Sequence, residues 1–200
     1  YKIKLSGDLT RDRGKFDVFR SWPPGSFRLR VDANNLWHGA DEAISALAAL
    51  DLPLFAIEEP IRPNQYGELA AIGDRLNAMI VLDESLLRAG QVNALPPVQS
   101  GWIINLRVSK MGGLLRSLEV IEAARRAGIG VIVGAQVGET SLLTRAALTV
   151  AHASGALLVA QEGAFGTLLL ERDVCDPSLM FGNRGILTTA AYPNLQCPGF

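Results

Sequence analysis

The sequence predicts an α/β fold in which a parallel sheet is covered by helices. Strand-like runs alternate with helix-like runs along the whole chain, and the strand-like runs begin about 23 to 29 residues apart. No linker, low-complexity tract or change of composition divides the chain, so we expect a single domain over residues 1–200. Consecutive strands joined by a helical crossover pair in parallel, which is why the alternation favours a parallel sheet.

Seven short apolar runs are predicted as strands. They are Lys2–Leu5, Phe27–Val31, Leu54–Ile57, Met79–Leu82, Trp102–Val108, Val131–Val133 and Leu157–Ala160. Segments between them carry apolar residues at i, i+3, i+4 and i+7, which is typical of a helix with one buried face. The clearest are Asp41–Leu50, Leu115–Gly128 and Thr140–Ala153. Asp41 and Thr140 are predicted N-caps, and Gly128 is placed to end a helix.

Composition indicates a soluble globular protein, which we expect in the cytoplasm. Of the 200 residues, 48% are hydrophobic, and the formal net charge of −1 gives no electrostatic case for binding nucleic acid or an anionic membrane. No apolar run reaches the roughly 18 residues that a membrane span needs, and the N-terminus does not have the layout of a signal peptide. Cys175 and Cys197 are too few and too far apart for a metal or CxxC site, so we expect reduced thiols, with a disulfide near the C-terminal end as the alternative.

The number of strands leaves two architectures open. Seven strand–helix units are one short of a closed (β/α)8 barrel, and the first predicted strand starts with no residues leading into it. An open α/β sheet fits this pattern as well as a barrel that lacks its first strand. Such a barrel would expose two strand edges, so for it we expect either a homo-oligomer or an additional N-terminal segment.

Acidic residues at the ends of three consecutive predicted strands favour the barrel. Asp32 follows one strand, Glu58 and Glu59 the next, and Asp83 and Glu84 the third. A single acidic residue there is most often a turn or capping residue. Three in a row are different, because catalytic groups of (β/α)8 barrels lie at the carboxyl ends of the strands. Parallel strands lie about 4.8 Å apart, so these carboxylates are predicted to reach one divalent cation.

The ligand type predicts the ion. Oxygen ligands with no His or Cys nearby select a hard cation, Mg²⁺ or else Mn²⁺. Alternation of side chains along each strand favours Asp32, Glu58 and Asp83 as ligands, with Glu59 and Glu84 as the alternates. Asn34 shares the face of Asp32. We expect Asn34 and Glu84 to orient the ligands without binding the metal themselves.

The first predicted strand carries Lys2 and Lys4 on one face. An exposed edge strand protected from aggregation by lysines is the structural explanation. The functional explanation is a lysine that points at the substrate and acts as a base, namely Lys4, with Lys2 as a neighbouring cation.

Five short motifs, in order along the chain, carry a family resemblance. KIK, VDANNLW, IEEP, LDES and KMGG resemble the C-terminal barrel of the enolase superfamily, in particular its muconate lactonizing enzyme subgroup, which includes o-succinylbenzoate synthases and dipeptide epimerases. The resemblance covers nearly the whole chain. It implies Mg²⁺-assisted abstraction of a proton α to a carboxylate through an enediolate, with Lys4 as base and Asp32, Glu58 and Asp83 as metal ligands. Family members also carry a capping domain and a first barrel strand, which this sequence lacks.

The sequence departs from the family at Arg107, where a second lysine normally faces the first across the substrate. A guanidinium stays protonated at neutral pH, so Arg107 is not suited to be a second base. It can hold a carboxylate or enolate, or it can be a buried arginine paired with a carboxylate such as Asp83. We therefore expect a one-base syn-elimination, as in a dehydratase or an o-succinylbenzoate synthase. A racemase, epimerase or cycloisomerase is the alternative within the superfamily, and a non-catalytic metal-binding relative is the alternative outside enzymes.

Other residues at the carboxyl ends of the strands are predicted to contact a small carboxylate substrate. The sequence does not specify the identity of that substrate. Gln136, Glu162 and Phe165 follow the last two predicted strands and are expected to form the substrate wall. The mandelate racemase branch would be expected to have a histidine after the seventh strand, and none stands there. His152 is expected to be structural, whereas His38 follows a predicted strand and can lie near the site, with a catalytic role as the less favoured alternative. The glycines of KMGG match no phosphate-binding fingerprint and are explained by a tight turn.

Overall fold

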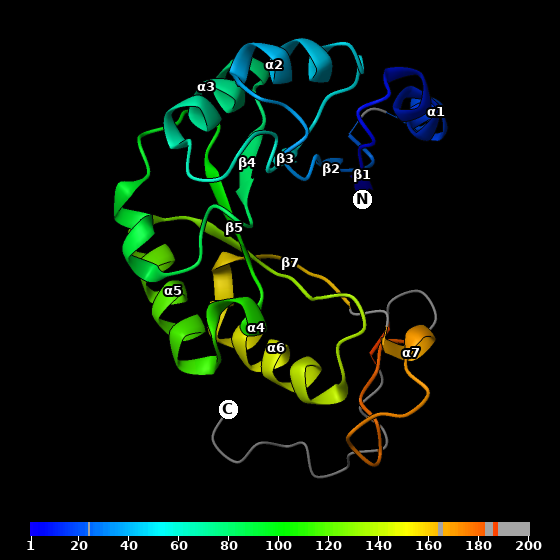
Figure 1. Ribbon diagram of the computed structural model, residues 1–200, viewed down its shortest axis with the longest axis vertical. Helices are drawn as coiled ribbons and strands as arrows, with labels where there is room; N and C mark the ends of the chain where they lie inside the picture. The colour runs from blue at the N-terminus through cyan, green and yellow to red at the C-terminus, as the bar shows by residue number, and fades with distance from the viewer. Residues whose placement is uncertain (24, 164–165, 183–185, 188–200) are drawn as a thin grey trace. The chain divides into compact units, whose positions relative to one another are not determined.

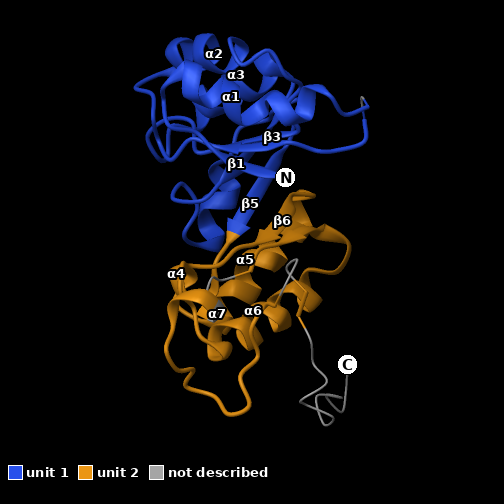
Figure 2. Cartoon of the chain, turned by 90° about the vertical axis from the view of Figure 1, so that its right-hand side faces the viewer, with its two compact units in different colours: residues 1–105 blue, residues 106–200 orange. Residues whose placement is uncertain are grey.

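The computed structural model describes residues 1–23, 25–163, 166–182 and 186–187 (Figure 1). The chain forms two compact units, residues 1–105 and residues 106–200 (Figure 2). Both units are built from parallel strands that alternate with helices, which confirms the predicted α/β fold of the (β/α)8-barrel type. The extent of the domain, residues 1–200, stays a prediction.

The first unit is a parallel sheet whose strand order follows the chain. Its strands are β1 (Lys2–Lys4), β2 (Arg30–Asp32), β3 (Ala56–Glu58), β4 (Met79–Leu82) and β5 (Trp102–Leu106), whose last residue begins the second unit. Each strand pairs in parallel with the next. The register places Lys4 beside Asp32, and Asp32 beside Glu58. The charged residues that end three successive strands therefore lie side by side in one row.

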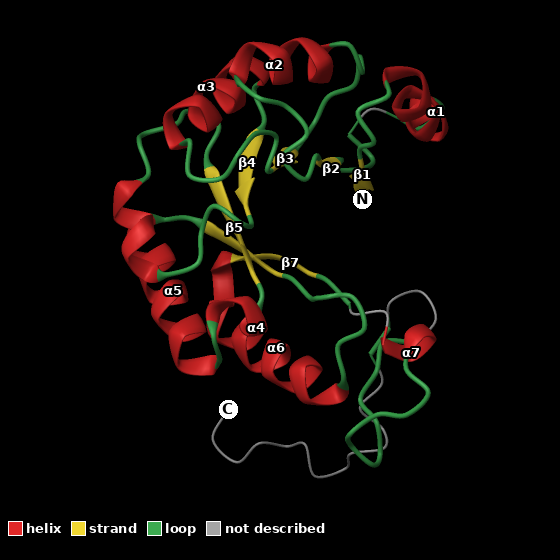
Figure 3. Cartoon of the chain, in the orientation of Figure 1, coloured by secondary structure: helices red, strands yellow, loops and turns green. Residues whose placement is uncertain are grey.

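Helices cover this sheet. They are α1 (Leu9–Arg20), α2 (Ala40–Ala48), α3 (Tyr66–Leu76) and the short 3₁₀ helix η1 (Ala89–Ala94). Helix α3 packs against both α2 and β4 (Figure 3). Central apolar residues of β2 to β5 are fully buried, among them Val31, Ile57, Ile80 and Ile103. Runs of buried β-branched residues are what a parallel sheet between covered faces requires.

The second unit contains two parallel strands, β6 (Gly130–Val133) and β7 (Leu158–Gln161). Its helices are α4 (Val108–Met111), α5 (Leu114–Ala127), α6 (Ser141–Ser154), η2 (Gly155–Leu157) and α7 (Gly166–Leu169). Helix α5 packs against α6. The carbonyl of Leu106 accepts a hydrogen bond of 2.8 Å from the N–H of Gly134. None of the helices in the described part of the chain is both long and apolar enough to cross a membrane.

Several element boundaries differ from the prediction. Strands β2 and β3 run later than expected and include Asp32 and Glu58 as their last residues. The N-cap of α2 is Gly39, so the prediction of Asp41 as N-cap was wrong, and Asp41 lies in the first turn. Thr140 as N-cap and Gly128 as the end of a helix are confirmed, Gly128 with a φ of +67° that suits glycine.

Candidate active site

The ends of β1, β2 and β3 bring two lysines and two carboxylates together. The Lys2 Nζ lies 3.0 Å from Asp32 Oδ2 and 3.0 Å from Glu58 Oε2, and it donates a hydrogen bond of 3.1 Å to Glu58 Oε1. Asp32 is 3% exposed and Glu58 is fully buried. Buried carboxylates need compensating charge, and the Lys2 ammonium supplies it from between them.

Lys4 is in a different position from Lys2. Its Nζ donates a hydrogen bond of 3.0 Å to Asn34 Oδ1 and lies 3.9 Å from Asp32 Oδ2. The side chain of Lys4 is 70% exposed, whereas that of Lys2 is 27% exposed. Asn34 also donates its backbone N–H to Asp32 Oδ1 at 3.2 Å. Lys4 is therefore the lysine with room to meet a substrate, while Lys2 is held by carboxylates.

Glu58 has two further partners that the sequence did not single out. Asn105 Nδ2 on β5 donates a hydrogen bond of 2.7 Å to Glu58 Oε1, and Arg30 Nε lies 3.5 Å from Glu58 Oε2. Burial raises the pKa of the Glu58 carboxyl above its usual range, Lys2 opposes the rise and Asp32 adds to it. Alternation along β2 places Arg30 on the face of Asp32, and this was the one signal for Arg30 as a site residue.

The Glu59 carboxylate accepts hydrogen bonds from the residues that follow β4. Its Oε1 accepts hydrogen bonds from the N–H of Asp83 at 2.7 Å and the N–H of Ser85 at 2.8 Å, and its Oε2 accepts one from Ser85 Oγ at 2.8 Å. The residue is fully buried with a φ of +39°. Burial raises the pKa of Glu59 to about 7, although the hydrogen bonds from Ser85 and Asp83 lower it. These contacts fix the backbone of Asp83, which is 5% exposed.

This arrangement predicts the effect of removing the Glu59 carboxylate. Glu59→Ala leaves the donors of Asp83 and Ser85 without their acceptor, so we expect the free energy of unfolding to fall by roughly 3 kcal/mol. Glu59→Gln keeps an acceptor oxygen for the two N–H groups, and its amide can donate to Ser85 Oγ, so we expect a loss below about 1 kcal/mol. Chemical denaturation of both variants measures the difference. Equal losses in the two variants would contradict this role.

The donor chemistry of the strand ends fits a hard cation. Asp32 and Glu58 present adjacent buried carboxylates, whose negative charge is balanced in this structure by Lys2 and Arg30. Oxygen donors of this kind suit Mg²⁺. Within the residues that the structure describes, no three His, Cys, Asp or Glu side chains are grouped closely enough to hold an ion. The assignment of Asp32, Glu58 and Asp83 as metal ligands, with Asn34 and Glu84 as their support, therefore stays a prediction.

The second unit contains the other predicted site residues. Arg107 Nη1 donates a hydrogen bond of 2.9 Å to Gln136 Oε1, so these two predicted residues contact each other. The N–H of Gln136 donates to Glu139 Oε1 at 2.8 Å. Glu162 follows β7, where its N–H donates to the carbonyl of Val133 at 2.8 Å. Phe165 and Cys197 lie outside the described residues.

The predicted strand Trp102–Val108 ends earlier in the structure, at Leu106, and a short helix follows it. Arg107 is the N-cap of the short helix α4, and Lys110 lies in the last turn of that helix. Helix α4 begins directly after Arg107. It ends within a single turn at Gly112, whose φ of +85° suits glycine.

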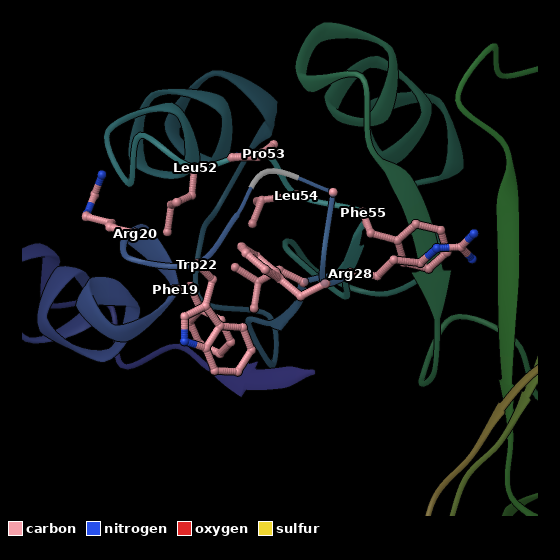
Figure 4. A pocket seen from close by; sticks show the side chains of 11 residues that line it. Phe19, Arg20, Trp22, Arg28, Leu52, Pro53, Leu54 and Phe55 are labelled. Atoms are coloured by element: carbon pink, nitrogen blue, oxygen red, sulfur yellow. The ribbon is translucent and has the colours of Figure 1, made fainter.

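An apolar pocket in the first unit lies at the opposite ends of the strands. Its volume is about 390 Å³, and residues just before β2 and β3 line it together with the end of α1 (Figure 4). The rings of Phe19 and Trp22 meet edge to face at 5.2 Å, and the Arg28 guanidinium lies 5.1 Å from the centre of the Phe55 ring. Among the described residues that line the pocket there is no carboxylate or lysine. The candidate active site is therefore the row of charged groups at the carboxyl ends of the strands.

The fold and this row of charged groups define a class of barrel proteins with acidic strand ends. Residues 1–191 match the family described as enolase C-terminal domain-like, and the chain belongs to that family. The predicted resemblance to the enolase superfamily is confirmed.

Curated relatives include several enzymes. The chain is 30% identical to the hydrophobic dipeptide epimerase of Enterococcus faecalis over 76% of this chain and 43% of the relative. It is 30% identical to the D-Ala-D/L-Ala epimerase of Cytophaga hutchinsonii over 93% of this chain and 50% of the relative. It is 35% identical to an o-succinylbenzoate synthase of Mycobacterium tuberculosis over 75% of this chain and 44% of the relative. The chain thus spans about half the length of these relatives.

Solved structures agree in fold. The crystal structure of a dipeptide epimerase from Cytophaga hutchinsonii, complexed with Mg and the dipeptide D-Ala-L-Val, superposes with a TM-score of 0.75 at 27% identity. That match covers 94% of this chain and 50% of the other. A muconate lactonizing enzyme superposes with a TM-score of 0.71 at 28% identity, over 86% of this chain and 48% of the other.

Proposed function

We propose that this chain carries the proton-abstracting groups of an enzyme that acts, with Mg²⁺, on a small-molecule carboxylate. The observation that carries the proposal is the row formed by Lys4, Asp32 and Glu58, in which an exposed amine stands beside two buried carboxylates. Epimerases and o-succinylbenzoate synthases among the relatives support this chemistry. A non-catalytic metal-binding relative would not need the exposed lysine beside the buried carboxylates.

In this proposal Lys4 removes the proton α to the substrate carboxylate. Asn34 Oδ1 accepts a hydrogen bond from Lys4 Nζ and so holds the amine at the end of β1. Lys2 balances the charge of Asp32 and Glu58 and keeps both carboxylates oriented. Asp32, Glu58 and Asp83 would hold Mg²⁺, whose charge stabilises the negative charge that develops on the substrate carboxylate. Mn²⁺ would suit the same oxygen donors.

We propose a one-base reaction, a syn-elimination of the kind that a dehydratase or an o-succinylbenzoate synthase performs. Arg107 occupies the sequence position at which the family resemblance expects a second lysine, and a guanidinium does not readily take up a proton at neutral pH. Arg107 and Gln136, hydrogen-bonded to each other, would contact the substrate together with Glu162 and Phe165. Epimerisation is the second candidate, because two of the three relatives described above are epimerases.

Turnover of the full-length protein in deuterated water tests the proposal. A panel of succinylbenzoate-type precursors, N-acyl amino acids, dipeptides and acid sugars would be incubated with Mg²⁺, and α-deuterium incorporation would be followed by NMR for each enantiomer. We expect exchange or elimination from one face of the α-carbon only. Rapid incorporation from both faces that persists in Lys110→Ala would contradict the one-base mechanism and favour epimerisation.

A further inference from the structure

We propose that Asp12 and Lys15 of helix α1 are positioning residues for the base Lys4. The inference rests on the proposed role of Lys4. Lys15 Nζ donates hydrogen bonds of 2.7 Å both to the backbone carbonyl of Lys4 and to Asp12 Oδ1. Asp12 and Lys15 are three residues apart on one helix, so their side chains leave it on the same side. The ion pair thus ties α1 to the residue that carries the amine.

The Asp12 carboxylate also organises the loop that follows Lys4. Both of its oxygens accept hydrogen bonds of 3.0 Å from the N–H of Ser6, and it accepts others from Ser6 Oγ at 2.8 Å and from the N–H of Gly7 at 3.1 Å. Asp12 is 3% exposed. Burial raises the pKa of Asp12, but the hydrogen bonds and the charge of Lys15 outweigh burial and hold that pKa below its usual range. The loop therefore folds around a buried carboxylate that is ionised at neutral pH.

The peptide group that joins Lys4 to Leu5 is consequently hydrogen-bonded at both its carbonyl and its N–H. Its carbonyl is held by Lys15, and the next residue, Leu5, donates its N–H to the carbonyl of Asp32 at 2.9 Å. The side chain of Lys4 is long and 70% exposed, with its amine hydrogen-bonded to Asn34. The position of the amine therefore depends both on its hydrogen bond to Asn34 and on where the backbone of Lys4 lies. Misplacing a catalytic group by about 1 Å costs on the order of 100-fold in rate.

A loop that only needed capping would be served by Asp12 alone. The contact that distinguishes positioning from capping is the one from Lys15 to the carbonyl of the base itself. Replacing Lys15 by Met removes this contact and leaves every hydrogen bond from Ser6 and Gly7 to Asp12 in place. Lys15→Met is therefore the variant to test, because it still allows the loop to fold.

The matched control is Arg13→Met. Arg13 lies on the same helix and donates, through Nε, a hydrogen bond of 2.9 Å to the carbonyl of Ala49, away from Lys4. In the full-length protein, with a substrate from the panel above, we expect Lys15→Met to lower kcat by about 10- to 100-fold with KM within about twofold. We expect a larger primary isotope effect on kcat with α-deuterated substrate, because proton transfer becomes slower. Lys15→Arg should recover much of kcat, and Arg13→Met should keep it.

The outcomes separate this inference from the proposed function. If Lys15→Met keeps the parent kcat while Lys4→Ala is inactive, the positioning role is wrong and the proposed function stands. A kcat that falls only in proportion to the fraction of folded enzyme, measured by circular dichroism, would also overturn positioning. If Lys4→Ala keeps full turnover, the proposed function itself fails.

Discussion

Lys4→Ala in the full-length protein is expected to lower turnover by about 10³-fold or more, because a positioned general base contributes roughly 10² to 10⁴ in rate. The side chain of Lys4 is 70% exposed, so its removal takes little surface out of the core. We therefore expect the free energy of unfolding to change by less than about 0.5 kcal/mol. Steady-state kinetics on an active substrate and chemical denaturation measure the two effects.

Lys110→Ala is the control for this prediction. It removes a lysine from the last turn of α4 rather than from the end of β1, and we expect it to keep turnover within a few-fold. Exogenous alkylamines should restore part of the activity of Lys4→Ala, since a small amine can occupy the space of the missing side chain. A Lys4→Ala variant as active as Lys110→Ala would show that the base lies elsewhere.

The row at the strand ends was predictable because its geometry follows from local rules. Parallel strands of similar length in register bring their last residues together, so Lys4, Asp32 and Glu58 are neighbours once the strands are recognised. The prediction that Lys4 and Lys2 share a face follows from alternation, and both amines do lie near Asp32. The different exposure of the two lysines depends on what surrounds them and was not predictable from alternation.

Glu59 shows where alternation fails. With a φ of +39° it follows the last residue of β3, and its side chain points to the backbone of Asp83 and Ser85. A left-handed residue changes the direction of the chain, so the two-residue period no longer assigns its face. The sequence alone thus left Glu59 as an alternate metal ligand. In the structure its oxygens instead accept hydrogen bonds from Asp83 and Ser85.

Helix α1 and the hydrogen bond between Asn105 and Glu58 were not predicted from the sequence. Asp12, Phe16 and Phe19 are the buried residues of α1, too few apolar positions for a clear helical period. Asn105 lies within the predicted strand Trp102–Val108, but its hydrogen bond to Glu58 joins β5 to β3 across the intervening strand β4. Contacts between residues far apart in sequence are set by tertiary packing, and no local pattern contains them.

Mg²⁺ binding to the full-length protein is expected to weaken by about 100-fold or more in each of Asp32→Asn, Glu58→Gln and Asp83→Asn. Each change replaces a charged oxygen ligand by a neutral amide, and Mg²⁺ gives up its hydration shell reluctantly without anionic ligands. Isothermal titration measures the affinity without a substrate, so this test does not depend on knowing the reaction. Asp32 and Glu58 lie side by side in the sheet. Asp83 is held through its backbone N–H, which donates a hydrogen bond to Glu59.

The control is Asp74→Asn, because Asp74 accepts a hydrogen bond of 2.8 Å from the N–H of Gln99, away from the row at the strand ends. We expect it to bind Mg²⁺ like the parent. Glu84→Gln tests the alternate ligand. If Glu84→Gln weakens binding as much as Glu58→Gln while Asp83→Asn does not, Glu84 is the third ligand in place of Asp83. Parent-like binding in all three predicted variants would mean that the row of carboxylates is held by Lys2, Arg30 and Asn105 for a purpose other than binding a metal.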